Sequence, residues 1–514
     1  MPWDLLMIAA LLGGILIGYP VAFTIAGVAA LFALAGAATG AFDLALLGAL
    51  GQRVTGLLTN EVLIAIPLFV FMGVMLERSR VAEDLLETMG RLFGPMPGGL
   101  GVSVVVVGAL LAASTGIVGA TVIAMGLIAL PSMLRNGYDP RLASGLVCTA
   151  GTLGQIIPPS TLLIILSDVM SNAYQQAQFA EGKFSIETIS VGQIFAAALG
   201  PGLLLVAIYL GYLAALALFA PRAVPAMARP ETPPALGEVL GAIATPLLLI
   251  VAVLGAILGG VATPTEAASV GAVGAILMAG LRTGAPRALI LSGAAALLVL
   301  AIAAGAAPVR LQRLDAGLGD WALGGAYAGL ALLGLAAIGA ALRSALRQGV
   351  LVPALTSTMT VTAMIFATIL TASMFALVFL GFGGDARIEA ILEAMPGGPT
   401  GALVFSMALI FALGFFMDFV EISVIVLPLV APVLIAMGHD PLWLAILIAI
   451  NLQTSFLTPP FGFSLFYLRG AAPKEVSTGQ IYAGVAPFIL LQLLGIALVW
   501  TLPEIALWLE RLLY

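Results

Sequence analysis

The chain has 514 residues, of which 62% are hydrophobic and only 9% are charged, and its formal net charge is −6. So apolar a composition excludes a water-soluble globular domain and indicates an integral membrane protein. No cluster of basic residues offers a nucleic-acid surface, and the single cysteine, Cys148, excludes an internal disulfide. The single histidine, His439, argues against a histidine-based metal site.

Long continuous apolar runs predict an all-α polytopic membrane protein. A helix crosses a bilayer with about 20 apolar residues, whereas a barrel would show alternating segments of about ten. About twelve such runs are found, at 4–18, 20–38, 61–76, 141–171, 192–219, 239–260, 264–281, 288–308, 321–342, 350–381, 441–471 and 481–507.

Two further apolar stretches, 99–134 and 399–437, do not fit a single crossing. Each is interrupted near its middle, at 114–119 (STGIVG) in the first and at 414–421 (GFFMDFVE) in the second. The half-segments of about 15 residues are too short to cross alone. Both stretches therefore predict re-entrant hairpins, with tips buried in protein because unpaired backbone cannot face lipid.

Two charged segments, 77–94 and 385–395, precede the hairpins. Their charges alternate with Leu, Ile and Met at helical spacing, which is typical of helices that lie along the membrane surface. A solvated loop helix fits the same pattern, so the sequence leaves both interpretations open.

An internal repeat relates the two halves of the chain. Six residues recur at a constant offset of 301: Pro131, Gly137, Asp139, Pro140, Pro158 and Pro159 as Pro432, Gly438, Asp440, Pro441, Pro459 and Pro460. Upstream, 96–99 (MPGG) recurs as 395–398. Six matches in one register, four of them prolines, predict a duplicated unit.

A fainter match pairs Pro20 and Gly27 with Pro264 and Gly271, at an offset of only 244. The difference places about 56 extra residues between 271 and 395. Segments 288–308 and 321–342 fit an inserted pair of helices, at about 288–342, to which the sequence assigns no function.

The placement of arginines predicts the orientation, because cytoplasmic loops carry an excess of Arg and Lys. Five arginines flank the first hairpin, which should open to the cytoplasm: Arg78, Arg80, Arg91, Arg135 and Arg141. Acidic residues and His439 flank the second, which should open outside. Arg310, Arg313 and Arg387 are exceptions. Repeats that face opposite ways form an inverted repeat, an architecture of secondary transporters that bind at the midplane where helices break.

A double proline interrupts an apolar span in each half, at Pro158-Pro159 and at Pro459-Pro460. Each proline lacks an N–H and displaces the carbonyl one turn back, which frees backbone oxygens in a low-dielectric region. Na⁺ would satisfy them, because hard cations take oxygen ligands and unwound helices coordinate Na⁺ in several transporters. A structural kink satisfied by neighbouring helices is the alternative. Two equivalent breaks, each paired with a polar tip, favour ion sites.

Four motifs are informative as a set: 136–140 (NGYDP), 151–160 (GTLGQIIPPS), 263–268 (TPTEAA) and 451–462 (NLQTSFLTPPFG). Together they resemble the large membrane subunit of the tripartite ATP-independent periplasmic (TRAP) transporters. The resemblance covers nearly the whole chain apart from the inserted helices and a longer polar loop at 172–190.

This resemblance implies Na⁺-coupled uptake of small organic acids by a multi-pass protein of the bacterial inner membrane. It implies two partners, a periplasmic substrate-binding protein that delivers the acid and a small four-helix membrane subunit. It also implies an elevator mechanism, in which hairpins and broken helices move as a transport domain against a scaffold domain.

On this plan the chain divides into five regions. They are scaffold helices (1–76), a surface helix with first hairpin, first broken helix and next span (77–219), a cytoplasmic linker (220–238), scaffold helices with the inserted pair (239–381), and the second surface helix, hairpin, broken helix and last span (382–514).

The same resemblance implies two Na⁺ sites, each between a hairpin tip and a broken helix. The positions that match the first are Ser114, Thr115, Gly154, Ile157 and Pro159, and those that match the second are Gly414, Ser455 and Thr458. The repeat supports this pairing, because Gly154 and Ile157 correspond to Ser455 and Thr458. The first tip departs from the serine-rich pattern common in the family, so its ion ligands would be mainly backbone carbonyls.

A carboxylate substrate needs hydrogen-bond donors near the breaks. The candidates are Gln155, Ser160, Thr161, Asn451, Gln453 and Thr454. No Arg or Lys lies in either double-proline motif, so binding would rely on half-helix N-termini and neutral donors, with Na⁺ supplying positive charge.

Five acidic residues lie in or beside apolar segments: Glu61, Asp168, Glu266, Asp418 and Glu421. An acid in the membrane is costly and predicts function. Asp418 and Glu421 lie at the second tip, where we predict ion attraction or gating. Glu266 follows a Thr-Pro-Thr start that favours helix capping. Glu61 fits an interfacial helix end, and Asp168 fits either role.

Other functions are less consistent with the sequence. An enzyme would need a nucleophile with its base or a metal cluster, and neither HExxH nor GxSxG is present. A primary pump would need a P-loop, which is absent. The remaining alternatives are a stand-alone inverted-repeat anion carrier that needs no binding protein and, more distantly, a channel.

Overall fold

The computed structural model describes residues 2–79, 81–116, 118–227, 235–309 and 317–514, and every regular element in these ranges is helical. Eight of these helices are long and apolar enough to cross a membrane, or up to eleven crossings if each of three bent pairs counts as one. The prediction of an all-α polytopic membrane protein is confirmed. The expected number of about twelve also counts segments whose helices are shorter, such as Trp3–Leu16 and Pro441–Leu457.

The first half begins with α1 (Trp3–Leu16), α2 (Val21–Ala38), η1 (Leu44–Ala49), α3 (Leu50–Leu58) and α4 (Glu61–Arg78). The helical segment at 44–58 is not predicted from the sequence. It joins α4 with a bend of 53°. Asn60 lies at this bend and caps α4, because its side-chain oxygen accepts a hydrogen bond from the Val62 N–H at 3.0 Å.

The first hairpin and broken helix follow. Their elements are α5 (Val81–Phe93), α6 (Gly99–Thr115), α7 (Val118–Arg135), α8 (Pro140–Thr152), η2 (Leu153–Gln155), α9 (Thr161–Ala180) and α10 (Val191–Phe219). The predicted end of the broken helix at 171 and the polar loop at 172–190 are wrong, because α9 continues for two more turns to Ala180. The polar side chains of Asn172 and Gln176 in this part of α9 line a cavity, so the helix continues through them.

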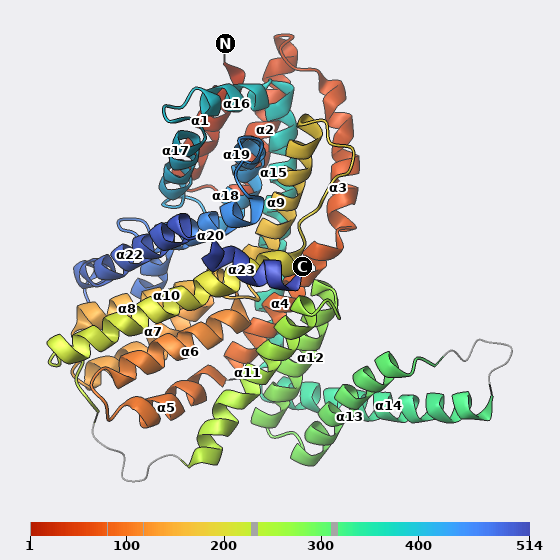
Figure 1. Cartoon of the computed structure of the whole chain (residues 1–514), viewed down its shortest axis with the longest axis vertical. Coiled ribbons are helices and arrows are strands. Elements are labelled where there is room, and N and C mark those ends of the chain that lie inside the picture. The colour runs from red at the N-terminus through yellow and green to blue at the C-terminus, as the bar shows by residue number, and fades with distance from the viewer. Residues whose placement is uncertain (1, 80, 117, 228–234, 310–316) are drawn as a thin grey trace.

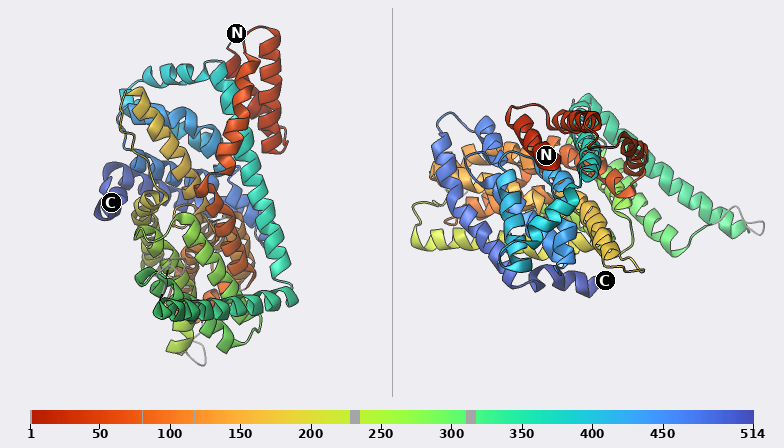
Figure 2. Two further views of the ribbon diagram at one scale, coloured as in Figure 1. Left: turned by 90° about the vertical axis from the view of Figure 1, so that its right-hand side faces the viewer. Right: turned by 90° about the horizontal axis from the view of Figure 1, so that it is seen from above.

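The second half begins with α11 (Leu236–Leu258), α12 (Pro264–Arg282), α13 (Arg287–Ala306), α14 (Leu318–Arg347) and α15 (Leu351–Gly381). Glu266 forms a capping box with Thr263, as the sequence predicts: its Oε2 accepts from the Thr263 N–H at 2.8 Å. The inserted α13 and α14 form a two-helix arm that projects from the rest of the molecule (Figures 1 and 2). Residues 310–316, with Arg310 and Arg313, lie outside the described ranges.

The chain ends with α16 (Gly384–Glu393), α17 (Gly398–Leu413), α18 (Phe419–Ile425), α19 (Leu427–Ala436), α20 (Pro441–Leu457), α21 (Phe463–Ala471), α22 (Thr478–Thr501) and α23 (Glu504–Leu513). Two details differ from prediction. The returning arm of the second hairpin is itself bent by 57° between α18 and α19. The last segment is two helices, because Pro503 follows the end of α22 and α23 begins beyond it.

The two predicted surface helices, α5 and α16, each form an ion pair with a distant helix. Asp84 of α5 pairs with Arg282 at the end of α12, and Arg387 of α16 pairs with the buried Asp4 of α1. Arg387, an exception to the charge count, is therefore paired with a buried acid of α1.

The hairpins pack crosswise on the broken helices. The α7 arm of the first hairpin contacts α21 of the second break, and α19 of the second hairpin contacts α9 of the first. At the first contact, a Cβ on Gly126 would lie 2.9 Å from Leu468. Glycine therefore permits the close approach, and each half covers elements of the other. Figure 1 shows α6, α7 and α8 below α17, α18 and α19, while α9 rises to the level of α18 and α19.

Candidate functional site

Both double-proline segments break their helices, as the sequence predicts. In the first, η2 ends at Gln155 and α9 begins at Thr161, and the Ser160 hydroxyl donates to the Gln155 carbonyl at 2.9 Å. In the second, α20 ends at Leu457 and α21 begins at Phe463. Both Pro–Pro peptide bonds are cis. Gly154 and Pro159 are buried and Ile157 is half-buried.

The first hairpin tip lies against the first break. Gly116 has a φ of +60°, and a Cβ at this position would lie 3.0 Å from both the N and the Oγ1 of Thr161. The tip backbone thus contacts the start of α9. Ser114 and Thr115 are the last two residues of α6. Their side chains lie outside the described part of the structure, and so does the whole of Ile117.

The second hairpin tip lies against the second break. A Cβ on Gly414 would lie 2.1 Å from the Ser455 Oγ, so only glycine allows this approach. Ser455 donates to the Leu452 carbonyl at 2.8 Å and Thr458 donates to the Thr454 carbonyl at 2.7 Å. The structure therefore brings together the three residues predicted for the second Na⁺ site.

The predicted substrate donors divide into two groups. Asn451 and Thr454 make structural hydrogen bonds, to the Met407 carbonyl at 2.8 Å and to the Ile450 carbonyl at 2.7 Å. Ser160 is likewise engaged locally. The others, Gln155, Thr161 and Gln453, are buried polar side chains with atoms that find no partner among the described residues: Gln155 Oε1 and Nε2, Thr161 Oγ1 and Gln453 Oε1.

Unpaired buried polar atoms are costly, at about 1–3 kcal/mol each, so native proteins satisfy nearly all of them. Gln453 also bonds across to the first half, since its Nε2 donates to the Thr152 Oγ1 at 3.4 Å. The two broken helices therefore carry unsatisfied oxygens and an amide, and one of these atoms, the Thr161 Oγ1, lies against the first hairpin tip. Such a group of atoms suits an ion or a polar ligand.

Asp418 and Glu421 form a capping box at the start of α18. The Glu421 Oε2 accepts from the Asp418 N–H at 2.9 Å, and the Asp418 Oδ1 accepts from the Phe419 N–H at 2.7 Å. One oxygen of each carboxylate thus has a structural partner. Asp418 also lines a cavity, so a gating role stays a prediction for it.

A cavity of about 400 Å³ reaches both hairpin tips. We call it the inner cavity, because Arg78, one of the arginines that predict the cytoplasmic side, lies in its wall. The tips contribute Val118 and Asp418, the first break contributes Thr161, and α15 contributes Ser357 and Ile365. Thr161, one of the residues with an unpaired hydroxyl, therefore lies in the wall of this cavity.

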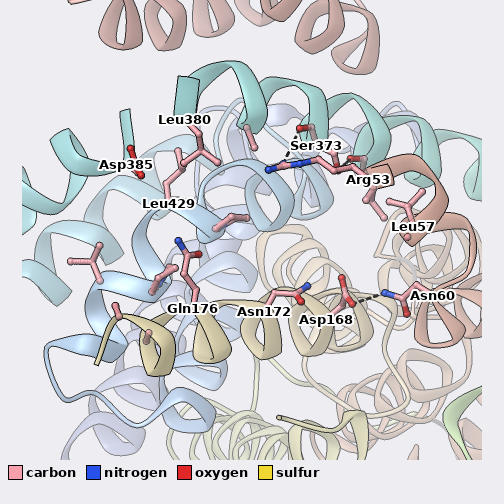
Figure 3. A pocket seen from close by; sticks show the side chains of 18 of the residues that line it. Arg53, Leu57, Asn60, Asp168, Asn172, Gln176, Ser373, Leu380, Asp385 and Leu429 are labelled. Atoms are coloured by element: carbon pink, nitrogen blue, oxygen red, sulfur yellow. Dashed lines mark hydrogen bonds between the residues drawn. The ribbon is translucent and has the colours of Figure 1, made fainter. Parts of the chain in front are cut away.

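A second cavity, of about 700 Å³, lies on the other side of the tips, and we call it the outer cavity. It is bounded by α3, α4 and α15 on one side and by α9, α16 and α19 on the other (Figure 3). Along α15 the two cavities are one turn apart, at Ile365 and Ile369. The two cavities thus lie at successive levels along α15.

Sequence reasoning missed several residues of the outer cavity. Arg53 lies in α3, which is not predicted, and Asn172 and Gln176 lie where a loop is expected. The spacing of Asp168, Asn172 and Gln176 by four residues is a helical signal that could have identified them.

Comparisons with known proteins support one family over nearly the whole chain. The model of the tripartite ATP-independent periplasmic transporter DctM component matches residues 6–505. A relative from Vibrio cholerae, the C4-dicarboxylate TRAP transporter large permease protein DctM, is 28% identical over 88% of this chain and 86% of its own length. The ectoine TRAP transporter large permease TeaC of Halomonas elongata is 25% identical over 99% of both chains.

A third relative and a solved structure extend the comparison. The sialic acid TRAP transporter large permease SiaM of Vibrio cholerae is 24% identical over 98% of this chain and 97% of its own. The crystal structure of the YdaH transporter of Alcanivorax borkumensis is similar in fold, with a TM-score of 0.52 and 18% identity over 91% of this chain and 88% of that one. The two halves, their hairpins and the family match lead to one conclusion: the chain belongs to the large permease (DctM) component of the tripartite ATP-independent periplasmic transporters.

Proposed function

We propose that this chain is the membrane-spanning permease of a Na⁺-coupled system that takes up small carboxylates across the bacterial inner membrane. A periplasmic binding protein delivers the substrate, and a small four-helix membrane subunit accompanies the permease. The proposal rests on the family, whose relatives are described as permeases for C4-dicarboxylates, ectoine and sialic acid. Transport by such a chain is a binding and conformational process, not catalysis.

The observation that carries the Na⁺ coupling is the set of unpaired buried oxygens at the two breaks. Thr161 Oγ1, Gln155 Oε1 and Gln453 Oε1 are acceptors of the kind that hard cations prefer, and carbonyls beside Gly154, Ile157 and Pro159 add to the donor set. At the second break, Ser455 lies against the Gly414 tip, and the Thr458 N–H donates to the Ser455 carbonyl at 3.1 Å. The residues thus fit Na⁺, and the ion would supply positive charge beside a bound carboxylate.

The two cavities support an elevator mechanism as part of the same proposal. Helices α4 and α15 line both cavities, whereas the hairpins and broken helices form the opposite walls. A movement of the hairpins and breaks along α4 and α15 would expose the tips alternately to the two sides. Because Thr161 and Asp418 line the inner cavity, we assign this structure, within the proposal, to the state open to the arginine-rich side.

Reconstitution in liposomes tests the system as a whole. We expect acid uptake only when the permease, its small partner and the loaded binding protein are present with an inward Na⁺ gradient. Uptake by the purified chain alone would contradict the proposal and favour a stand-alone carrier.

Substitutions at the second break test the ion site. Ser455→Ala and Thr458→Ala should each raise the Na⁺ concentration for half-maximal uptake by about tenfold, which is ~1.4 kcal/mol. The matched control is Thr501→Ala, which removes a similar hydroxyl bonded to the carbonyl four residues earlier, at 2.8 Å, near the end of α22. Unchanged Na⁺ activation in both variants would exclude this site.

A further inference from the structure

A row of polar side chains lines the outer cavity along α9. Asp168, Asn172 and Gln176 follow one another at intervals of one turn and point into the cavity in Figure 3. The preceding part of α9 is apolar and buried, from Leu162 to Leu166. A row of polar side chains in a membrane helix is costly if it faces lipid, because lipid offers no hydrogen-bond partners. Such a row is therefore expected to face a polar ligand or water.

One cation lies across the cavity from this row. Arg53 of α3 donates from Nη1 to the Ser373 carbonyl at 3.3 Å, which holds the guanidinium at the cavity wall (Figure 3). It is the one basic residue among the described lining residues, which include three acids, Asp168, Asp385 and Glu389. The cavity therefore offers one site for an anionic group in a lining that is otherwise acidic.

Asp168 is held in place by Asn60. The Asn60 Nδ2 donates to the Asp168 Oδ1 at 2.7 Å, and the orientation of this amide is fixed because its oxygen caps α4. Asp168 is thus positioned as an acceptor through one oxygen, and its Oδ2 is the atom through which it would meet a ligand.

We propose that the outer cavity selects small zwitterions, in which a carboxylate binds Arg53 and a cationic group binds Asp168. The inference rests on the proposed function, since it specifies the class of carboxylate that the permease admits. A dicarboxylate would bring its second negative charge into a cavity whose lining includes three acids, and like charges disfavour binding. A zwitterion finds an opposite charge for each end.

The cavity also has the position that an entry site needs. An adjoining cavity of about 230 Å³ shares Arg53, Asp168 and Asn172 with the outer cavity and extends to Ile165 and Val424. Ile165 lies one turn from Thr161, whose hydroxyl is unpaired at the first break. A molecule held between Arg53 and Asp168 would therefore lie about two turns along α9 from Thr161.

Protection of an introduced cysteine tests the proposal on the purified full-length chain without a Na⁺ gradient. Asn172→Cys places a thiol in the cavity, and the native Cys148 gives little background because it is fully buried. The probes are 4-aminobutanoate, butanoate and succinate, which share a four-carbon chain. We expect 4-aminobutanoate to slow maleimide labelling at concentrations at least tenfold lower than either of the others.

Charge variants then identify the two contacts. In the Asn172→Cys background, Asp168→Asn should reduce the preference for 4-aminobutanoate over butanoate to less than threefold, and Arg53→Gln should abolish protection by both. Asp168→Asn keeps an oxygen for Asn60, so the fold is preserved. Asp43→Asn is the matched control, because Asp43 is exposed, caps η1 and does not line the cavity.

Three results would overturn the inference: equal or better protection by succinate, an unchanged preference in Asp168→Asn, or no protection by any probe. These outcomes are measured without Na⁺-driven uptake, so a failure of the inference can be distinguished from a failure of the proposed function. If Na⁺-driven uptake is absent while the protection pattern holds, the proposed coupling fails and the zwitterion site stands.

Discussion

Thr152 and Gln453 are hydrogen-bonded to each other, with 3.4 Å between the Thr152 Oγ1 and the Gln453 Nε2, although they lie 301 positions apart. This separation is the offset of the sequence repeat, so each residue occupies the position of the other in its own half. The bond therefore joins the two broken helices, α8 and α20, at the point where the halves meet.

Removal of one partner of this bond should destabilise the protein. Thr152→Val deletes the acceptor and leaves the Gln453 amide buried and unpaired, which costs about 1–3 kcal/mol. Thermal unfolding of the purified protein would show a lower midpoint. The double variant Thr152→Val/Gln453→Leu should lose less than the sum of the single variants, because it leaves no unpaired group. Ser144→Ala, which removes a hydroxyl bonded to the Pro140 carbonyl of its own helix, is the control. Additive losses would contradict a direct coupling.

An added methyl group at the second tip should impair transport. In Gly414→Ala the new Cβ would lie 2.1 Å from the Ser455 Oγ, so the tip must move away from the break. We expect Na⁺-dependent uptake to fall at least tenfold while the protein still folds. Gly27→Ala adds the same group to α2, where nothing lies within 4 Å, and should leave uptake unchanged. Full activity of Gly414→Ala would show that the tip does not need this contact.

The two ion pairs of the surface helices should differ in their contribution to stability. Asp4 is 2% exposed and its partner Arg387 is 44% exposed, whereas Asp84 and Arg282 are 39% and 45% exposed. Arg387→Gln leaves a buried carboxylate unpaired, so a loss of about 3–5 kcal/mol is expected. Arg282→Gln should cost no more than about 1 kcal/mol, because exposed pairs are screened by water. Denaturation followed by circular dichroism measures both, and equal losses would contradict the burial argument.

The two cavities should be reachable from opposite sides of the membrane. Val361→Cys lines the inner cavity and Ala376→Cys lines the outer one, while Thr368→Cys lies between them and is buried. An impermeant maleimide should label Val361→Cys only in inside-out vesicles and Ala376→Cys only in right-side-out vesicles, and it should label Thr368→Cys in neither. Labelling of both lining positions from one side would place the cavities on a single face.

The sequence predicts the repeated features well, because prolines and glycines at fixed spacing encode them. Proline and glycine have backbone properties that no other residue shares. They therefore predict the breaks at Pro158-Pro159 and Pro459-Pro460 and the hairpin tip at Gly414. The contact of each tip with its own break was expected from family resemblance. That Gly414 meets Ser455, at a distance that excludes any side chain, follows only from the three-dimensional structure.

The features that sequence reasoning missed depend on tertiary context. Apolar runs end at 171 because Asn172 and Gln176 are polar, yet α9 continues since those side chains face a cavity and not lipid. Helix α3 mixes Gly, Arg and Thr with leucines and is too short to give a membrane-crossing signal. The sequence therefore does not identify Arg53 as a residue of a cavity wall. The first error comes from taking lipid as the only surroundings of a membrane helix, and the second from the weak periodic signal of a nine-residue helix.

The crosswise packing of α7 on α21 and of α9 on α19 has a consequence for synthesis. The partner of α7 is made more than 300 residues later, so the first hairpin enters the membrane without the surface that will cover it. The same holds for α9 until α19 is complete. These faces of α7 and α9 therefore stay uncovered until the second half is made, and their final packing follows the insertion of both halves.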